Sequence, residues 1–514
     1  MKILLTLSLT LSLILLSCSA DKDKASFTIE EASISSIIDA YKKGSISCEN
    51  LVKEYISRIE KYDQASGLNS IVIINPEAIN IAKEKDKLLK MGKELPPLHG
   101  IPVIVKDNYN TVGLQTAAGS LAMKDFEPET DSWIVRKLKE SGAIVLAKSN
   151  MAEWAFSPMV TISSIAGETR NPYNLDYVPA GSSGGTAAAV AANFGAVGLG
   201  TDTGNSIRGP SSHNCLVGFR TSLGLVSRAG IVPLYLRNDV GGPMTRTVED
   251  ATIILDVIAG YDPADPLTAY SSGKIPESYT DYLQIDGLSN ARIGICQDII
   301  DRGIDPEIEQ IFYRAIEDLR AGGARVIENI KIENFDEISK GHWASAFQYD
   351  LNNYLLQQGD GVPVKSLDEI IEAGNYSDYI KDNLLYHKNH PGNPAENSPP
   401  ALDVFNDPGR IAFRNAIEQK MEELSLDAII YPSWSYPPAR IGEFDEYRGD
   451  NSQIISPHTG QPAFTIPMGF LKNKLPVGLQ FLGKMFDEAS LIKLVYSYEQ
   501  STNHRKAPDN FSEK

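Results

Sequence analysis

Residues 179–210 read PAGSSGGTAAAVAANFGAVGLGTDTGNSIRGP, and the rest of the chain is organised around this stretch. Serines stand among glycines at both of its ends, at Ser182-Ser183 and at Ser206. Glycine adopts backbone conformations that other residues avoid and lets main-chain N–H groups approach another group closely. Two such turns therefore favour a site that combines serine hydroxyls with main-chain donors.

The segment between the two turns predicts a helix followed by a strand. Thr186–Asn193 is rich in small, helix-favouring residues, and Ala196–Thr201 is a short apolar run typical of a buried strand. The order turn, helix, strand, turn returns the chain to the end of the unit where it started. We therefore expect Ser182 and Ser206 to lie at the same end.

Ser183 also fits a different hydrolase motif. Residues 181–185, GSSGG, match G-x-S-x-G, the nucleophile turn of α/β-hydrolases, which must follow a strand directly. Pro172 and Pro179 precede this turn, and proline is poor strand material because it has no N–H to donate. An α/β-hydrolase-type esterase that uses Ser183 is therefore the less favoured alternative.

GSSGG followed by GTDTGNSIRGP resembles the defining region of the amidase signature family of serine hydrolases. Upstream, Gly100–Asp107 reads GIPVIVKD and matches the strand that bears the family's lysine. The resemblance covers about residues 29–500 and is weakest at 335–424. Three further segments match the family: 142–151 (GAIVLAKSNM), 218–233 (GFRTSLGLVSRAGIVP) and 475–481 (LPVGLQF).

The resemblance implies an α/β fold with a central mixed, twisted sheet covered by helices on both faces. It also implies an amidase that cleaves a carboxylic or peptide amide to an acid and ammonia or an amine. Ser206 would be the acyl nucleophile, and Ser182, which follows a cis peptide bond in the family, would relay its proton to Lys106. The presence of Lys106, Ser182 and Ser206 together disfavours a second alternative, an inactive amidase-like binding lipoprotein.

The loop before Ser206 carries the oxyanion donors by the same resemblance, through the main-chain N–H groups of Thr203, Gly204 and Asn205. Family members commonly have glycine where this chain has Asn205. If the position requires a positive φ, asparagine is one of the few residues that tolerate it. The longer side chain could also narrow the leaving-group side, so it bears on specificity more than on activity.

Lys106 is suited to serve as the base for a serine nucleophile. A serine needs a base to take its proton, and a lysine can do so only when neutral. Lys106 ends the apolar run 101–105, where burial would lower its pKa from about 10.4. The alternative is a structural pair with the adjacent Asp107. We expect Asp202 and Arg208 to form a supporting ion pair.

The amino terminus is typical of an exported lipoprotein. Lys2 precedes the mostly apolar run 3–16, which is too short to span a bilayer and resembles a signal-peptide core. It ends in LLSC, similar to a bacterial lipobox, which predicts lipid attachment at Cys18; an ordinary secretory signal is the alternative. We expect a signal peptide at 1–17, a tether at 18–27 and a single amidase domain at 28–505.

Composition restricts the classes of partner and cofactor that the sequence predicts. The net charge of −18 argues against nucleic acid, because phosphate binding needs a basic surface. The expected partners are a small-molecule or peptide amide and, through the lipid, the bacterial cell envelope on the outer-membrane or periplasmic side. No motif calls for a metal or other cofactor, and the three cysteines after Cys18 are expected to be buried or free thiols: Cys48, Cys215 and Cys296.

Periodicity predicts alternating helices and strands over much of the chain. Residues 28–63 are expected to form two helices, the first with a Thr28–Glu31 capping box and a stop at Gly44, the second starting at Ser47. By resemblance, the segment 337–397 helps to wall the substrate site, with Trp343, Tyr349 and Tyr354 as candidates. Further helices are predicted at 78–91, 131–141, 246–259, 305–321 and 487–500, and further strands at 71–74, 143–147, 291–294, 428–431 and 463–467.

Overall fold

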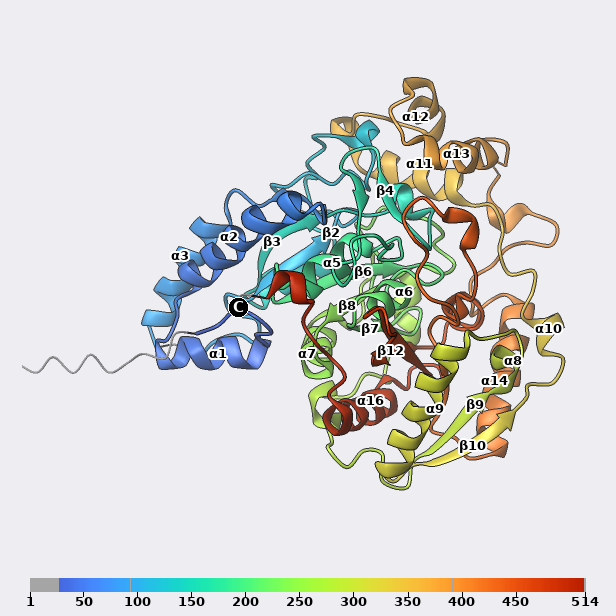
Figure 1. Cartoon of the computed structure of the whole chain (residues 1–514). Helices are drawn as coiled ribbons and strands as arrows, with labels where there is room; N and C mark the ends of the chain where they lie inside the picture. Colours follow the sequence, from blue (N-terminus) through green and yellow to red (C-terminus); the bar gives the residue numbers. More distant parts are fainter. Residues whose placement is uncertain (1–26, 93, 391, 513–514) are drawn as a thin grey trace, which may run out of the picture.

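The computed structural model describes residues 27–92, 94–390 and 392–512. The predicted signal peptide, Cys18 and nearly all of the predicted tether lie outside the described residues. Within the described residues, no helix is both long enough and apolar enough to cross a membrane. The α/β architecture expected from the sequence is confirmed: a long, twisted sheet runs through the molecule, with helices on both of its faces (Figure 1).

Eleven strands of the described residues form the central sheet, in the order β1-β3-β2-β6-β8-β7-β12-β13-β11-β9-β10. β2 pairs in parallel with β3 and β6, whereas β8 runs antiparallel to β6 and β7, so the sheet is mixed. The bounds are β1 Ile71–Ile74, β2 Pro102–Lys106, β3 Ile144–Ser149, β6 Val197–Asp202, β7 Val217–Arg220, β8 Val240–Thr245, β9 Arg292–Cys296, β10 Arg325–Ile330, β11 Ala428–Pro432, β12 Ala463–Phe470 and β13 Pro476–Leu482. Away from this sheet, β4 Thr161–Ser163 pairs with β5 Gly167–Thr169.

Helices of the described residues cover both faces, and a group of short helices lies at the top of Figure 1, above and to the right of β4. This group, α11 to α13, falls in a segment whose sequence has little strand pattern. The bounds are α1 Ile34–Lys43, α2 Cys48–Ser66, α3 Ala78–Lys90, α4 Trp133–Glu140, α5 Gly184–Ala191, α6 Arg208–His213, α7 Val248–Ile258, α8 Gln297–Ile300, α9 Pro306–Ala321, α10 Phe335–Ile338, α11 Phe347–Gln357, α12 Leu367–Ala373, α13 Lys381–Lys388, α14 Pro408–Glu423, α15 Ser456–Thr459 and α16 Glu488–Thr502.

Capping residues explain why several predicted helix ends are confirmed. Gly44 closes α1 with φ of 65°, and the side chains of Ser47, Thr247 and Asp305 accept hydrogen bonds from the first turns of α2, α7 and α9. These contacts involve residues close together in the sequence, which is why a sequence pattern can reveal them.

The predicted capping box of Thr28 and Glu31 is wrong. Helix α1 begins at Ile34, and the reciprocal cap is formed by Ser33 and Ser36. Glu31 has φ of 56°, outside helical geometry, and its carboxylate accepts hydrogen bonds from the guanidinium of Arg505, at 2.7 Å and 3.0 Å. A partner more than 400 residues away in the sequence therefore fixes Glu31.

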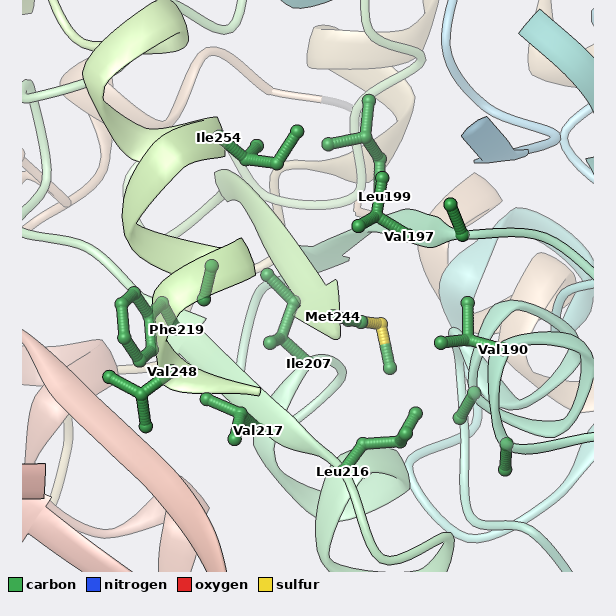
Figure 2. Close-up of a cluster of buried hydrophobic side chains, with 14 of the residues drawn as sticks. Val190, Val197, Leu199, Ile207, Leu216, Val217, Phe219, Met244, Val248 and Ile254 are labelled. Carbon is green, nitrogen blue, oxygen red and sulfur yellow. The ribbon is translucent and has the colours of Figure 1, made fainter. Parts of the chain in front are cut away.

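One face of the sheet is shaped to receive a single side chain. Gly200, Gly218 and Gly242 lie on the adjacent strands β6, β7 and β8, and a Cβ at any of them would lie within 3.1–3.2 Å of the side chain of Ile207. Figure 2 shows Ile207 inside the cluster formed by these strands and the helices beside them. Because Ile207 directly follows Ser206, this packing holds the predicted nucleophile against the sheet.

Replacing Gly242 with alanine tests this close packing. A Cβ at residue 242 would lie 2.2 Å from the carbonyl oxygen of Phe219 on β7, and backbone of a neighbouring strand cannot move aside without disturbing the sheet. We expect Gly242→Ala to lower the free energy of unfolding by about 1–3 kcal/mol in urea denaturation. Gly361→Ala is the control, because no heavy atom lies within 4 Å of its Cβ position; its change should stay within about 0.5 kcal/mol. Equal losses in the two variants would contradict the prediction.

Candidate active site

Lys106 lies at the end of β2, in the interior of the molecule, with no exposed surface. Its Nζ lies 2.7 Å from Oγ of Ser182 and 2.8 Å from Oγ1 of Thr201. Asn108 donates from Nδ2 to the same Thr201 hydroxyl at 3.1 Å. Lys106 therefore contacts two hydroxyl oxygens, and the alternative pairing with the adjacent Asp107 does not occur; Gly119 donates its main-chain N–H to the carboxylate of Asp107.

Burial sets the protonation of Lys106. Loss of water around the ammonium lowers the pKa of Lys106 to about 7, although the carboxylates of Asp202 and Asp239 oppose the shift. A neutral Lys106 is therefore well populated near pH 7. A neutral amine within hydrogen-bonding distance of a serine hydroxyl can take a proton from it.

Ser182 and Ser183 have different environments. The peptide bond between Gly181 and Ser182 is cis, as the family resemblance implied. Ser183 is fully buried at the start of α5, where its hydroxyl donates to the carbonyl of Thr201 at 3.2 Å. No strand directly precedes Ser183, so it does not occupy the strand-to-helix turn of an α/β-hydrolase, and the esterase alternative is wrong.

The loop 203–206 presents main-chain donors around Ser206. Within the described residues, no oxygen accepts a hydrogen bond from the N–H groups of Gly204, Asn205 or Ser206. The hydroxyl of Ser206 donates to Oδ1 of Asn205 at 3.3 Å, and Nδ2 of Asn205 donates to the carbonyl of Pro158 at 3.1 Å. Free N–H groups beside a serine hydroxyl can hydrogen-bond a developing negative oxygen.

Asn205 does not need the conformational freedom of glycine. Its backbone is outside the left-handed region, so asparagine is accommodated there without the strain that a positive φ would impose. Its side chain instead lines the cavity next to Ser206. The substitution therefore changes the shape and hydrogen bonding of the site.

A buried ion cluster joins the two ends of the loop 203–206, with Asp202 before the loop and Arg208 after it. The carboxylate of Asp202 accepts hydrogen bonds from Nε of Arg208 at 3.0 Å, from Nη1 of Arg220 at 2.7 Å and from the N–H of Ile207 at 3.1 Å. All three charged side chains are inaccessible to solvent. The guanidinium groups, Arg208 foremost, hold the pKa of Asp202 well below its usual range despite its burial. The predicted Asp202–Arg208 pair is confirmed, and Arg220 is a second partner that the sequence did not reveal.

A cavity of about 240 Å³ opens beside Ser206. None of the described residues that line it has an acidic or strongly basic side chain. Burial lowers the pKa of His387 to about 4, so this imidazole is neutral at pH 7. The lining residues are Ala155, Phe156, Pro158, Thr203, Gly204, Asn205, Ser206, Leu234, Tyr235, Trp343, Ala344, Ala346, Phe347, Asn383, His387 and Gln453.

The structure brings some of the predicted residues into this cavity and not others. Ser206, the loop before it and Trp343 line it, but Tyr349 and Tyr354 do not. The hydroxyl of Tyr354 donates to Oδ1 of Asn110 at 2.6 Å in the interior. Ser182 and Lys106 lie behind the cavity wall, fully buried. The described residues contain no cluster of three or more side chains suited to hold a metal ion.

Several residues of the site are not evident from the sequence. Thr201 contacts Lys106, and Phe156, Phe347 and Gln453 line the cavity. Thr201 lies in the quoted stretch, but its position there predicts only the end of a strand. Phe347 lies in the segment 337–397 that the resemblance assigned to the wall of the site, but no local signal distinguished it there; Phe156 and Gln453 come from segments with no motif.

A family model described as Amidase matches residues 50–492. The chain belongs to the amidase signature family. It is a hydrolase that acts on amide C–N bonds.

Individual relatives span nearly the whole chain. A probable amidase of Arabidopsis thaliana is 34% identical over 98% of this chain and 97% of its own length. One of the subunits of the glutamyl-tRNA(Gln) amidotransferase of Thermoanaerobacter pseudethanolicus is 32% identical over 91% of this chain and 96% of its own length.

Solved amidase structures are similar as well. The native peptide amidase of Stenotrophomonas maltophilia superposes with a TM-score of 0.82 at 33% identity, covering 93% of this chain and 98% of that one. An amidase family protein of Bacillus anthracis gives a TM-score of 0.82 at 32% identity, with 94% and 95% covered. The family and the fold that the sequence motifs predicted are thus confirmed.

Asp202→Asn tests the ion cluster beneath the loop. The substitution leaves two buried guanidinium groups without their carboxylate, so we expect it to lower the free energy of unfolding by about 3–5 kcal/mol. Chemical denaturation at pH 7 measures the loss. The control is Asp336→Asn. The side chain of Asp336 is 84% exposed and lies 3.1 Å from Arg302, so the loss of free energy of unfolding should not exceed about 1 kcal/mol. A small, similar cost in both variants would contradict the prediction.

Proposed function

We propose that this amidase hydrolyses neutral carboxamides, such as the amidated end of a peptide, through an acyl-enzyme on Ser206. The observation that carries the proposal is the buried contact of 2.7 Å between Lys106 Nζ and Ser182 Oγ, in a chain of the amidase family. The lowered pKa of Lys106 supports its role as the base, because it provides a neutral amine at physiological pH.

The reaction begins with proton transfer away from the nucleophile. Neutral Lys106 takes the proton of Ser182, and Ser182 takes the proton of Ser206 as Ser206 Oγ forms a bond to the amide carbon. The carbonyl oxygen becomes negative, and the main-chain N–H groups of the loop stabilise it; one such donor typically contributes a factor of about 10²–10³ in rate. These donors are Thr203, Gly204, Asn205 and Ser206.

Collapse of the tetrahedral intermediate breaks the C–N bond. Ser182 protonates the departing nitrogen and recovers its own proton from Lys106, so that ammonia or an amine leaves and the acyl group stays on Ser206 as an ester. Water then attacks this ester with the same relay as base. The acid is released, and Ser206 regains its proton.

The uncharged lining of the cavity supports a neutral substrate. An ammonium or carboxylate group next to the scissile amide would lose water without gaining a partner of opposite charge, which is costly. The lining supplies aromatic surface instead, from Phe156, Trp343 and Phe347. The structural likeness to the peptide amidase of Stenotrophomonas maltophilia supports a peptide or peptide-like amide.

Fluorophosphonate labelling of the full chain, purified in mild detergent, tests this mechanism. Peptide mapping should find the label on Ser206, at a rate that rises with pH through about 7 as Lys106 loses its proton. Lys106→Ala should slow the labelling and the release of ammonia from peptide amides by about 10²–10⁴-fold. The exposed Lys90→Ala is the control and should leave both rates unchanged.

Two outcomes would contradict the proposed mechanism. A label on another serine would reject Ser206 as the nucleophile. No label together with no turnover of a broad panel of amides would favour a binding lipoprotein without activity.

We further propose that the chain is exported and anchored by a lipid on Cys18 in the bacterial cell envelope, without a nucleic acid partner. The LLSC sequence after the apolar run and the net charge of −18 support these assignments.

Radiolabelled palmitate should enter the protein in cells, and Cys18→Ser should abolish incorporation and shift the protein from the detergent-rich to the aqueous phase of a Triton X-114 partition. Cys48→Ser, at a buried thiol of the domain, should retain the label. Unchanged incorporation in Cys18→Ser would reject the anchor.

A further inference from the structure

Gln453 presents a hydrogen-bond acceptor beside Ser206. It lines the same cavity and packs on the loop before the serine; a Cβ at Gly204 would lie 3.0 Å from Oε1 of Gln453 and 3.2 Å from its Cγ. The small size of Gly204 therefore lets the amide of Gln453 lie directly against the loop. The acceptor is thus close to the position that the reacting carbonyl would occupy.

The orientation of the Gln453 amide is fixed by its neighbours. Its Nε2 donates to Oδ2 of Asp450 at 2.9 Å and also to the hydroxyl of Tyr447. The Tyr447 hydroxyl in turn donates to the same carboxylate oxygen at 3.0 Å. Burial raises the pKa of the Asp450 carboxyl to about 7. Its Oδ2 accepts from both Tyr447 and Gln453, so the NH₂ end of Gln453 faces Asp450 and the carbonyl end faces away.

The segment that carries Gln453 is held to the sheet. Asn451 donates from Nδ2 to the carbonyl of Pro432, at the end of β11, at 2.8 Å and to Oγ of Ser435 at 2.7 Å. Gln453 is therefore attached to a rigid part of the fold, so its carbonyl has a defined position relative to Ser206 before a ligand arrives.

The Gln453 carbonyl has no partner within the part of the chain that the structure describes. The other polar side chains near Ser206 are engaged: Asn205 with Pro158 and Ser206 itself, and Thr203 with Asp239 at 2.6 Å. A carbonyl without a partner at the wall of a cavity is suited to accept a hydrogen bond from a ligand N–H.

We propose that Gln453 accepts a hydrogen bond from an N–H on the acyl side of the substrate, next to the scissile carbonyl. The substrate class is then an N-acylated amino-acid amide or peptide amide, whose last residue carries such an N–H. This inference rests on the proposed function and deepens it.

Burial indicates why the acceptor serves the acyl side rather than the leaving nitrogen. In the proposed mechanism the leaving nitrogen takes its proton from Ser182, which is fully buried behind the cavity wall. Gln453 is half-buried and lies on a segment that includes Tyr447, which is 37% exposed. With the leaving group directed inward, the acyl part extends outward past Gln453.

A pair of substrates tests the hydrogen bond with the full chain in detergent. One is N-acetylphenylalanine amide; in the other, 2-acetoxy-3-phenylpropanamide, an ester oxygen replaces the N–H. Ammonia release measures cleavage of the carboxamide in both. We expect the unmodified protein to prefer the first substrate by about 10-fold or more in kcat/KM, because the analogue leaves the carbonyl of Gln453 without a donor.

Variants assign the preference to Gln453. Gln453→Met keeps the length of the side chain but removes the acceptor, and it should bring the ratio of the two kcat/KM values close to 1 by lowering only the value for the N–H substrate. Tyr447→Phe removes the hydroxyl that accepts a hydrogen bond from Nε2 of Gln453, and it should reduce the ratio partly. Gln419→Met makes the same change at an exposed site on α14 and should leave the ratio as it is.

The outcomes separate the inference from the proposed function. Equal kcat/KM values of the unmodified protein for both substrates, or a preference that persists in Gln453→Met, would overturn the role of Gln453 and leave the amidase proposal intact. Equal losses for both substrates in Gln453→Met would also overturn it, since they would indicate a structural role in the loop. No ammonia from either substrate would reject the proposed substrate class and this inference with it.

Discussion

The site depends on the ion pairs and hydrogen bonds of the buried Asp202 carboxylate. This carboxylate lies between the guanidinium groups of Arg208 and Arg220 and also accepts the N–H of Ile207. These bonds link the residues before and after the loop 203–206. In addition, Ile207 fills the space left by three glycines on adjacent strands. The loop itself lines the cavity, and within the described residues the N–H groups of Gly204, Asn205 and Ser206 donate to no oxygen.

The same cluster bears on the chemistry of Lys106. A lone buried carboxylate nearby would favour the ammonium form and raise the pKa of the lysine. The ion pairs of Asp202 with Arg208 and Arg220 leave it a carboxylate, which favours the ammonium form of Lys106, but burial outweighs this effect and lowers the lysine pKa to about 7. Burial, and not the ion cluster, therefore allows a neutral amine at this position.

Two features of the cavity wall have no counterpart in the family motifs of the sequence. Asn205 extends a side chain where family members commonly have glycine, and its amide contacts the hydroxyl of Ser206. Gln453 comes from a segment nearly 250 residues later and is oriented by Asp450 and Tyr447. Together with the neutral, aromatic lining, they give a cavity wall whose polar groups are uncharged.

The sequence by itself determined the family, through the order of its motifs, and the helix ends at Gly44, Ser47 and Asp305; the mixed sheet with helices on both faces followed from the resemblance to that family. The motifs and the caps depend on residues close together in the chain, because each motif is a short run of residues and a cap binds the helix beside it. Only the tertiary structure decided where Glu31 binds, that Arg220 joins Asp202 and that Gln453 lies against Gly204. Each of these contacts joins different elements, from 18 residues apart for Arg220 and Asp202 to more than 400 for Glu31 and Arg505, and their positions follow from packing and burial, which leave no local pattern.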